Sequence, residues 1–208
     1  MNKVCKQDDK FFISGSPSVL SSIQYIFSFK SYIEAKNLYI NCNNIESLSK
    51  WSFHNEFDDY LIKNLIHDLV TQVDFLELND KTIIGFNLDD VYVVDNKNFF
   101  ICPNLSLLNI IDDTISIKFP FNKPLICCPE ILTASSLPIV LHSNSIKFMI
   151  GQLCIFCYFK SNILRGNELM AESQIEDILN PIKFSGIYWF VKKSILPEGK
   201  NRQLLYVD

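Results

Sequence analysis

The sequence has seven cysteines, and the spacing of four of them suggests a chemical role. Cys154 and Cys157 form a Cys-x-x-Cys pair, and Cys127 and Cys128 are adjacent. Four thiolates would complete the tetrahedral ligand set of a zinc ion. Cys154 and Cys157, however, stand in a continuous apolar run without turn residues, where cysteines are more often buried core residues. We expect free thiols of a reducing compartment, with zinc as the less favoured alternative.

Histidines and clustered charges offer little further chemistry. His54, His67 and His142 do not stand at spacings typical of a Ser/His/Asp or Cys/His catalytic group. Residues 55–95 are strongly acidic, which is a poor electrostatic match to nucleic acid. The cations at residues 192–202 are too few to indicate DNA or lipid binding, and we expect a solvated helix end there. We therefore expect neither a nucleic-acid partner nor a membrane partner.

The Cys-x-x-Cys pair lies in the most apolar stretch of the sequence, residues 145–159. Its apolar residues cover every side of a helix, so such a helix must be buried all round. Lys147 and Gln152 interrupt the stretch, which is also shorter than the roughly 20 apolar residues that cross a bilayer. We predict a central, buried helix in a soluble domain.

Hydrophobic periodicity predicts the remaining elements. A helix should begin at Ser16-Pro17, and a longer one should span residues 56–78, because apolar residues recur there at three- and four-residue spacing. Two strands joined by a turn are expected at residues 92–94 and 99–102. Further predictions are strands at residues 11–13, 37–41 and 115–119, an irregular segment from Pro120 to Glu130, helices at residues 172–179 and 187–195, and a loosely held N-terminal dozen.

Length and composition limit the possible architectures. The chain has 208 residues, 48% of them hydrophobic, and a formal net charge of −4. This is enough for one sizeable core with a small appended lobe. Residues 1–10 lack an apolar core of signal-peptide length, so we expect a cytoplasmic protein.

The order of these features resembles the C-terminal lobe of a protein kinase. A long amphipathic helix is followed by the turn GFNLDD at residues 85–90, a tight strand pair, an irregular segment ending in Cys128-Pro129-Glu130, a buried helix and Arg202. The chain is most similar to the divergent kinase-like proteins of large nucleocytoplasmic DNA viruses, which share an FxLDDIxVID-like turn and an xSPE-like motif. The resemblance implies an α+β, mainly α fold. Residues 1–50 would form a much reduced N-terminal lobe, and residues 51–208 a kinase-like helical lobe.

The catalytic positions implied by this resemblance are degenerate. In an active kinase, the Asp of His-Arg-Asp accepts the proton of the substrate hydroxyl. Here Gly85, Phe86 and Asn87 occupy that triplet, and Asp89 and Asp90 follow. The side-chain amide of Asn87 carries neither a negative charge nor a basic nitrogen, so it cannot act as a general base.

The metal and nucleotide positions are degenerate as well. Pro103 stands where the metal-binding Asp-Phe-Gly motif is expected, and proline cannot replace the oxygen ligand that magnesium prefers. Asp89 and Asp90 are expected to accept backbone hydrogen bonds in the turn, with magnesium binding as the alternative. Gly15 is the only glycine before Gly85, and no strand resembles Val-Ala-Ile-Lys. We therefore expect no ATP binding and no cofactor.

Other features of the kinase lobe are retained. The resemblance pairs Glu130, as the Glu of Ala-Pro-Glu, with Arg202, in an ion pair that fastens the irregular segment to the helical base. On the central helix, Phe148 and Gly151 match the aromatic residue and the glycine of the kinase pattern. Ile146 replaces the Asp that normally braces the catalytic loop, which agrees with the degenerate loop.

These features predict a catalytically inactive kinase-like protein, or pseudokinase, of viral origin. It would act in the host cytoplasm or in the virion by binding a host or viral protein. One alternative is an atypical phosphotransferase that uses Asp89 or Asp90, and another is a structural component of a virus particle. The resemblance names no partner, and a shared fold does not by itself supply a function.

Overall fold

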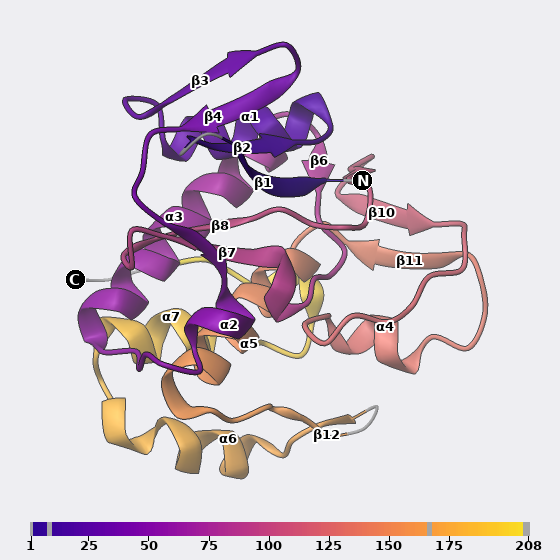
Figure 1. The fold of residues 1–208 in the computed structure, drawn as a ribbon. Coiled ribbons are helices and arrows are strands. Elements are labelled where there is room, and N and C mark those ends of the chain that lie inside the picture. The colour runs from indigo at the N-terminus through magenta and orange to yellow at the C-terminus, as the bar shows by residue number, and fades with distance from the viewer. Residues whose placement is uncertain (1, 8–9, 166–167, 206–208) are drawn as a thin grey trace.

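The computed structural model describes residues 2–7, 10–165 and 168–205, and Figure 1 shows its fold. Helices make up 40% of the structure and strands 24%, and the strands form small antiparallel sheets. This confirms the α+β class, with more helix than strand. In Figure 1 the sheet built from the N-terminal residues lies at the top, and helices of the C-terminal half lie at the bottom.

The N-terminal sheet has the strand order β1-β2-β4-β3, and α1 (Pro17–Ile26) packs against it. The prediction of a loosely held N-terminal dozen is wrong, because β1 pairs along its length with β2. No residue of β1 is buried, so backbone pairing holds the strand and no hydrophobic pattern marks it in the sequence. The four strands are β1 (Lys3–Gln7), β2 (Lys10–Ser14), β3 (Ser31–Glu34) and β4 (Asn37–Ile40).

A three-stranded sheet in the order β5-β7-β8 lies between two hydrophobic cores. It comprises β5 (Ile45–Ser47), β7 (Val91–Val94) and β8 (Asn98–Ile101), and the predicted β7–β8 strand pair is confirmed. Val93 and Ile101 belong to the larger core, whereas Val94 and Phe100 belong to the smaller core beneath the N-terminal sheet. The lobe boundary at residue 50 stays a prediction, although β5 pairs across it with β7.

The long helix α3 (Asp59–Glu77) begins three residues later than predicted. The carboxylate of Asp58 accepts a hydrogen bond from the backbone N–H of Leu61 at 2.8 Å, so Asp58 is the N-cap and the helix starts after it.

Two polar side chains of α3 form hydrogen bonds with the backbone groups on the outer edge of β8. Asp68 accepts a hydrogen bond from the backbone N–H of Phe99 at 2.9 Å. Gln72 accepts one from the N–H of Ile101 and donates one to its carbonyl, both at 2.8 Å. Because Asp68 and Gln72 lie one helical turn apart, they meet alternate residues of the strand.

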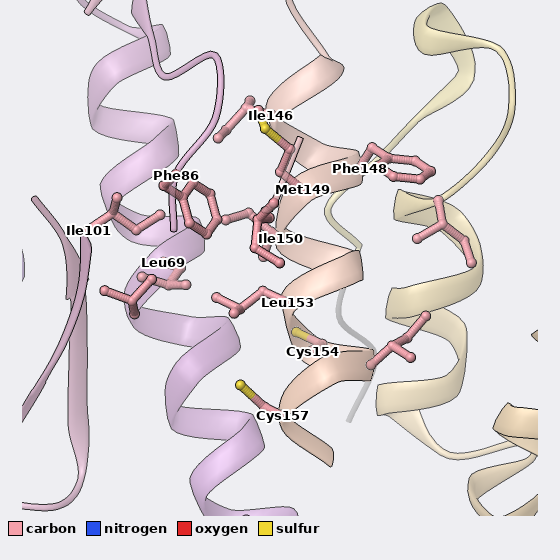
Figure 2. Packing of buried hydrophobic residues seen from close by; sticks show 14 of the residues in the cluster. Leu69, Phe86, Ile101, Ile146, Phe148, Met149, Ile150, Leu153, Cys154 and Cys157 are labelled. Carbon is pink, nitrogen blue, oxygen red and sulfur yellow. The ribbon is translucent and has the colours of Figure 1, made fainter. Parts of the chain in front are cut away.

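The central helix α5 (Ser145–Phe159) has the predicted bounds, and most of its residues are buried. Figure 2 shows Leu153 and Cys157 pointing toward α3, and Phe148 pointing toward α7 (Gly186–Ser194). A Cβ atom on Gly151 would lie 2.0 Å from Ser194 Oγ, so the glycine permits the close approach of α5 and α7.

The remaining elements are short. The predicted strand at residues 115–119 is β10 (Thr114–Ile117), and it pairs with β11 (Ile139–His142), which was not predicted. The predicted helix at residues 172–179 is α6 (Glu172–Leu179). The others are α2 (Leu48–Trp51), β6 (Lys81–Thr82), η1 (Leu88–Asp90), β9 (Leu108–Asn109), α4 (Pro129–Thr133), β12 (Leu164–Arg165), β13 (Glu168–Leu169), η2 (Asn180–Ile182) and η3 (Gly199–Asn201).

No helix in the part of the chain that the structure describes combines the length and the apolar character needed to cross a membrane.

Candidate functional site

The acidic turn at residues 85–90 is held against the Pro-rich segment by backbone hydrogen bonds. Phe86 and Ile126 exchange two of them, at 3.1 and 3.0 Å, in an isolated antiparallel bridge. A Cβ atom on Gly85 would lie 2.3 Å from Cγ of Pro124, so only glycine fits there without displacing the segment. The bridge therefore fixes the distance between the turn and residues 124–126.

Asn87 and Asp90 close the turn around the short 3-10 helix η1. The backbone N–H of Asn87 donates to Asp90 Oδ2 at 2.8 Å, and the Asn87 side chain completes a reciprocal capping box. The Asn87 Oδ1 atom also accepts a hydrogen bond from the N–H of Leu125 at 2.9 Å. The residue at the expected base position thus acts as a structural connector between the turn and the Pro-rich segment.

Asp90 is buried and both of its carboxylate oxygens have partners. Its Oδ2 atom accepts from the Asn87 N–H, and its Oδ1 atom accepts from the side-chain amide of Asn104. Burial raises the pKa of the carboxyl group, and the hydrogen bonds from Asn87 and Asn104 oppose this only in part. These contacts agree with the expected role of Asp90 as a turn residue.

Asp89 points to a different neighbourhood. Its Oδ1 atom accepts hydrogen bonds from the hydroxyl groups of Ser47 and Ser49, at the junction of β5 and α2. Asp89 therefore connects the acidic turn to the junction of β5 and α2, and Asp89 and Asp90 have different hydrogen-bond partners.

One pocket of about 480 Å³ is lined by four of the six positions that the kinase resemblance implies to be degenerate. The predicted residues Gly85, Phe86, Asn87 and Asp90 line it, together with Asn104. The rest of its described wall is Leu105, Ser106, Phe119, Pro120, Phe121, Asn122 and Pro124.

The pocket wall is apolar and amide-rich, and Asp90 is its only ionisable group among the described residues. The described wall contains no Lys, Arg or His that would complement phosphate. Pro103 is buried beside the pocket rather than in its wall, and its carbonyl accepts a hydrogen bond from the Asn2 side chain at 2.6 Å. Of the aromatic residues in the wall, the sequence had indicated Phe86 only, because Phe119 lay at the end of a predicted strand and Phe121 in the predicted irregular segment.

Glu130 and Arg202 form an ion pair away from the pocket wall. Nη2 of Arg202 lies 2.7 Å from Oε1 of Glu130, and the Arg202 side chain is fully buried. Its Nε and Nη2 atoms also donate to the carbonyl groups of Leu196 and Pro197, at 2.7 and 2.9 Å. The carbon atom of the guanidinium lies 4.9 Å from the ring centre of Phe148. The structure thus contains the ion pair that the resemblance implies, and the pair links α4 to the end of the chain.

The four cysteines considered for zinc are free and buried. Within the described residues, no group of three or more His, Cys, Asp or Glu side chains is arranged to hold a metal ion. Burial raises the pKa of the Cys127 thiol to about 11, and burial with the nearby charge of Glu130 raises that of Cys128 to about 12. Thiols with such pKa values stay protonated at neutral pH and are poor nucleophiles.

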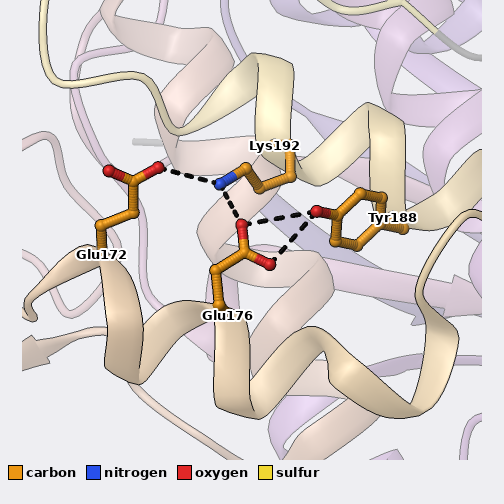
Figure 3. A network of polar contacts seen from close by, with 4 residues as sticks. All are labelled: Glu172, Glu176, Tyr188 and Lys192. Atoms are coloured by element: carbon orange, nitrogen blue, oxygen red, sulfur yellow. Dashed lines mark hydrogen bonds and ion pairs between the residues drawn. The ribbon is translucent and has the colours of Figure 1, made fainter.

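A polar network between α6 and α7 was not predicted. Figure 3 shows Lys192 between Glu172 and Glu176, with the Tyr188 hydroxyl group donating to Glu176 Oε2 at 3.1 Å. The hydrogen bond from Lys192 lowers the pKa of Glu176. The prediction of a solvated basic helix end at residues 192–202 is therefore wrong for Lys192, which is paired, and for Arg202, which is buried.

Comparisons with protein-family models and with curated proteins find no match to this sequence.

Proposed function

We propose that this chain is a catalytically inactive kinase-like protein of a large nucleocytoplasmic DNA virus. It acts in the host cytoplasm or in the virion by binding another protein. The observation that carries the proposal is the pocket beside the acidic turn. There the residues at the implied catalytic positions serve as hydrogen-bonded connectors and not as free functional groups.

Three properties of the pocket support the absence of phosphoryl transfer. Asn87, at the implied base position, accepts a hydrogen bond from Leu125 and has no proton-accepting nitrogen. Both oxygens of Asp90 accept hydrogen bonds from protein donors, so the turn already uses about half of the roughly four lone-pair sites that this carboxylate could offer a magnesium ion. The described wall holds no cation for the phosphates of a nucleotide.

The retained architecture and the exposed apolar groups support a protein partner. Glu130 and Arg202 keep the segment before α4 fastened to the helical base. The rim of the pocket exposes Phe119 by 40%, and the neighbouring Leu125 is exposed by 45%. Apolar side chains beside neutral amide groups suit a polypeptide with alternating apolar and polar groups better than a charged nucleotide.

An atypical phosphotransferase is the second candidate, and Asp90 is the observation that favours it. Asp90 lies in the pocket wall, and its burial raises its pKa, as is common for groups at catalytic sites. The thermal stability of the protein with and without millimolar ATP and magnesium separates the two candidates. A nucleotide at a hundredfold excess over its Kd would add about 2.7 kcal/mol of stability. We expect no shift, whereas a clear shift that Asp90→Ala abolishes would show nucleotide binding at this pocket and favour the phosphotransferase.

Protein binding through the pocket rim can be tested by affinity capture from infected cells. We expect proteins captured by the natural chain to be lost with Phe119→Asp and retained with Leu78→Asp. Leu78→Asp is the control, because it adds the same charge at the end of α3, where the Leu78 side chain is 83% exposed. If the same proteins are captured by all three chains, the pocket rim is not the binding surface.

A further inference from the structure

The N-terminal sheet ends in a strand whose outer edge has no partner among the described strands. In the order β1-β2-β4-β3, the terminal strand β3 pairs only with β4. Figure 1 shows β3 at the outer margin of the molecule. By contrast, the outer edge of β8 is satisfied by side chains of α3. An open edge presents backbone donors and acceptors to which another strand can pair.

The hydrogen bonds of the β3–β4 hairpin determine which backbone groups face outward. Ala35 and Lys36 both have positive φ, 48° and 67°, as in a type I′ turn, which places a hydrogen-bonded pair directly before and after it. The bond from the N–H of Asn41 to the carbonyl of Lys30, at 2.8 Å, fits the same alternation. Tyr32 and Glu34 therefore bond to β4, and the N–H and carbonyl groups of Ser31 and Ile33 face the open edge.

The side chains along this edge are apolar in the middle and oppositely charged at the ends. Tyr32 and Ile33 are each 45% exposed, and the neighbouring Phe29 is fully exposed. The Tyr32 ring stacks on Tyr39 of β4, with ring centres 5.1 Å apart. Lys30 lies two residues before Tyr32, and Glu34 lies two residues after it. Among the described residues, neither charged side chain forms an ion pair, and both are exposed.

We propose that β3 pairs antiparallel with β3 of a second copy of this chain, about a two-fold axis at Tyr32. In this register Lys30 of each copy lies opposite Glu34 of the other, and Tyr32 lies opposite Tyr32. Ser31 lies opposite Ile33, so the outward-facing backbone groups of both residues are matched. Residues 30, 32 and 34 share one face of the sheet, so both ion pairs flank the tyrosines on that face. This self-complementary order of charges favours a second copy over an unrelated strand, and it is independent of the proposed function.

Charge reversal tests the register by sedimentation equilibrium of the full chain. Lys30→Glu and Glu34→Lys should each raise the Kd of the dimer at least about tenfold, since either change makes two cross-strand pairs repulsive. An equimolar mixture of the two variants should associate again, because both glutamates of one variant strand then face the two lysines of the other across the interface. The double variant Lys30→Glu/Glu34→Lys should associate because it exchanges the two charges and so restores both attractive pairs.

Matched variants keep the test decisive. Lys36→Glu changes the net charge as Lys30→Glu does but lies in the turn, so it should leave the Kd unchanged. Ile33→Pro removes an outward-facing N–H and should abolish association while the far-UV circular dichroism stays that of the natural chain. A natural chain that is monomeric at about 1 mM overturns the proposal. So does a dimer that persists in Ile33→Pro, or a mixture of the two reversal variants that stays monomeric.

Discussion

Arg202 carries its charge where solvent is excluded, and its partners account for this. Its guanidinium contacts the carboxylate of Glu130, two backbone carbonyl groups and the ring of Phe148. Removing a charge from water costs several kcal/mol, and only such close partners offset that cost. The ion pair therefore specifies how α4 and the chain end are joined, more than it adds stability relative to an apolar pair.

Breaking this ion pair on either side should destabilise the protein strongly. Glu130→Ala leaves a buried guanidinium without its anion, and Arg202→Ala removes its contacts to the backbone and to Phe148. We expect each to lower the free energy of unfolding by about 3–5 kcal/mol, measured by urea denaturation. The double substitution should cost less than the sum of the two, because no buried charge is left unpaired.

The control for this cycle is an ion pair nearby in the sequence. Nζ of Lys200 lies 3.6 Å from Oε2 of Glu198, and both side chains are largely exposed. Lys200→Ala should therefore change the free energy of unfolding by no more than about 1 kcal/mol. Strictly additive effects of the Glu130 and Arg202 substitutions would show that their contact has no energetic coupling.

Asp90 could act as a hydrogen-bond acceptor in the turn or as a magnesium ligand, and substitutions of Asp90 distinguish these two roles. Asp90→Ala leaves the N–H of Asn87 and the side-chain amide of Asn104 without their protein acceptor in a part-buried turn, so it should cost about 0.5–1.5 kcal/mol for each lost hydrogen bond. Asp90→Asn keeps an acceptor for Asn87 and can pair with a flipped Asn104 amide, so it should cost much less at neutral pH. If Asp90 instead bound magnesium, the two substitutions should impair metal binding alike, because both remove the carboxylate.

The pH dependence of Asp90→Asn gives a further measurement. Burial raises the folded-state pKa of Asp90 above the usual 3.8, so the folded protein binds this proton more tightly than the unfolded chain does. The stabilising contribution of the protonated carboxyl is present below the unfolded pKa and is lost as pH rises through the folded pKa. The stability of Asp90→Asn relative to the natural chain should therefore increase from about pH 3 to about pH 7. A constant difference would mean that Asp90 is not held in an unfavourable environment.

Long helices with a clear apolar pattern were predictable from the sequence, and short edge strands were not. The bounds of α5 and α6 match the prediction, whereas α3 begins three residues late because Asp58 caps it. β1 and β3 were missed because backbone pairing, and no buried apolar face, holds them. The β3–β4 turn uses Ala35 and Lys36, which carry no turn signature.

The contact between α5 and α7 makes Gly151→Ala a sharp test of helix packing. A Cβ atom there would meet Ser194 Oγ at 2.0 Å and Ile195 Cγ2 at 2.8 Å. We expect overpacking to lower the free energy of unfolding by about 1–3 kcal/mol, although alanine favours helix by about 1 kcal/mol. Ser194→Ala removes the nearer obstacle, so the double variant should recover part of the loss in thermal denaturation. A stabilised Gly151→Ala would mean that the two helices are farther apart.

The residues of the pocket wall come from three distant segments, and this limits what the sequence alone could predict. The resemblance supplied residues 85–90, because their motif is local. Residues 119–124 lie against the acidic turn because Phe86 and Ile126 form a backbone bridge. Ile126 stands 40 residues after Phe86 in the sequence. A partner's binding surface therefore depends on the long-range packing of the irregular segment, where aromatic residues carry no periodic pattern.

The β7–β8 strand pair contributes side chains to both hydrophobic cores, so we expect the two cores to unfold together. One face of the hairpin contributes Val93 and Ile101 to the larger core, and the other contributes Phe100 to the smaller core. The indole N–H of Trp51, in the larger core, donates to Oδ1 of Asn96 in the turn of this hairpin at 2.9 Å. Loss of either core should therefore expose a face of the strands on which the other depends.

Phe100→Ala tests this coupling, because it alters only the smaller core while Trp51 reports on the larger one. Phe100 is fully buried, so its truncation should lower the free energy of unfolding by about 3–5 kcal/mol. In a Trp189→Phe background, urea midpoints from Trp51 fluorescence and from far-UV circular dichroism should fall together. Leu78→Ala, at a side chain that is 83% exposed, should move both midpoints little. If circular dichroism instead shows an early transition that Trp51 does not report, the N-terminal sheet unfolds separately. The two cores would then be independent units in spite of the strands they share.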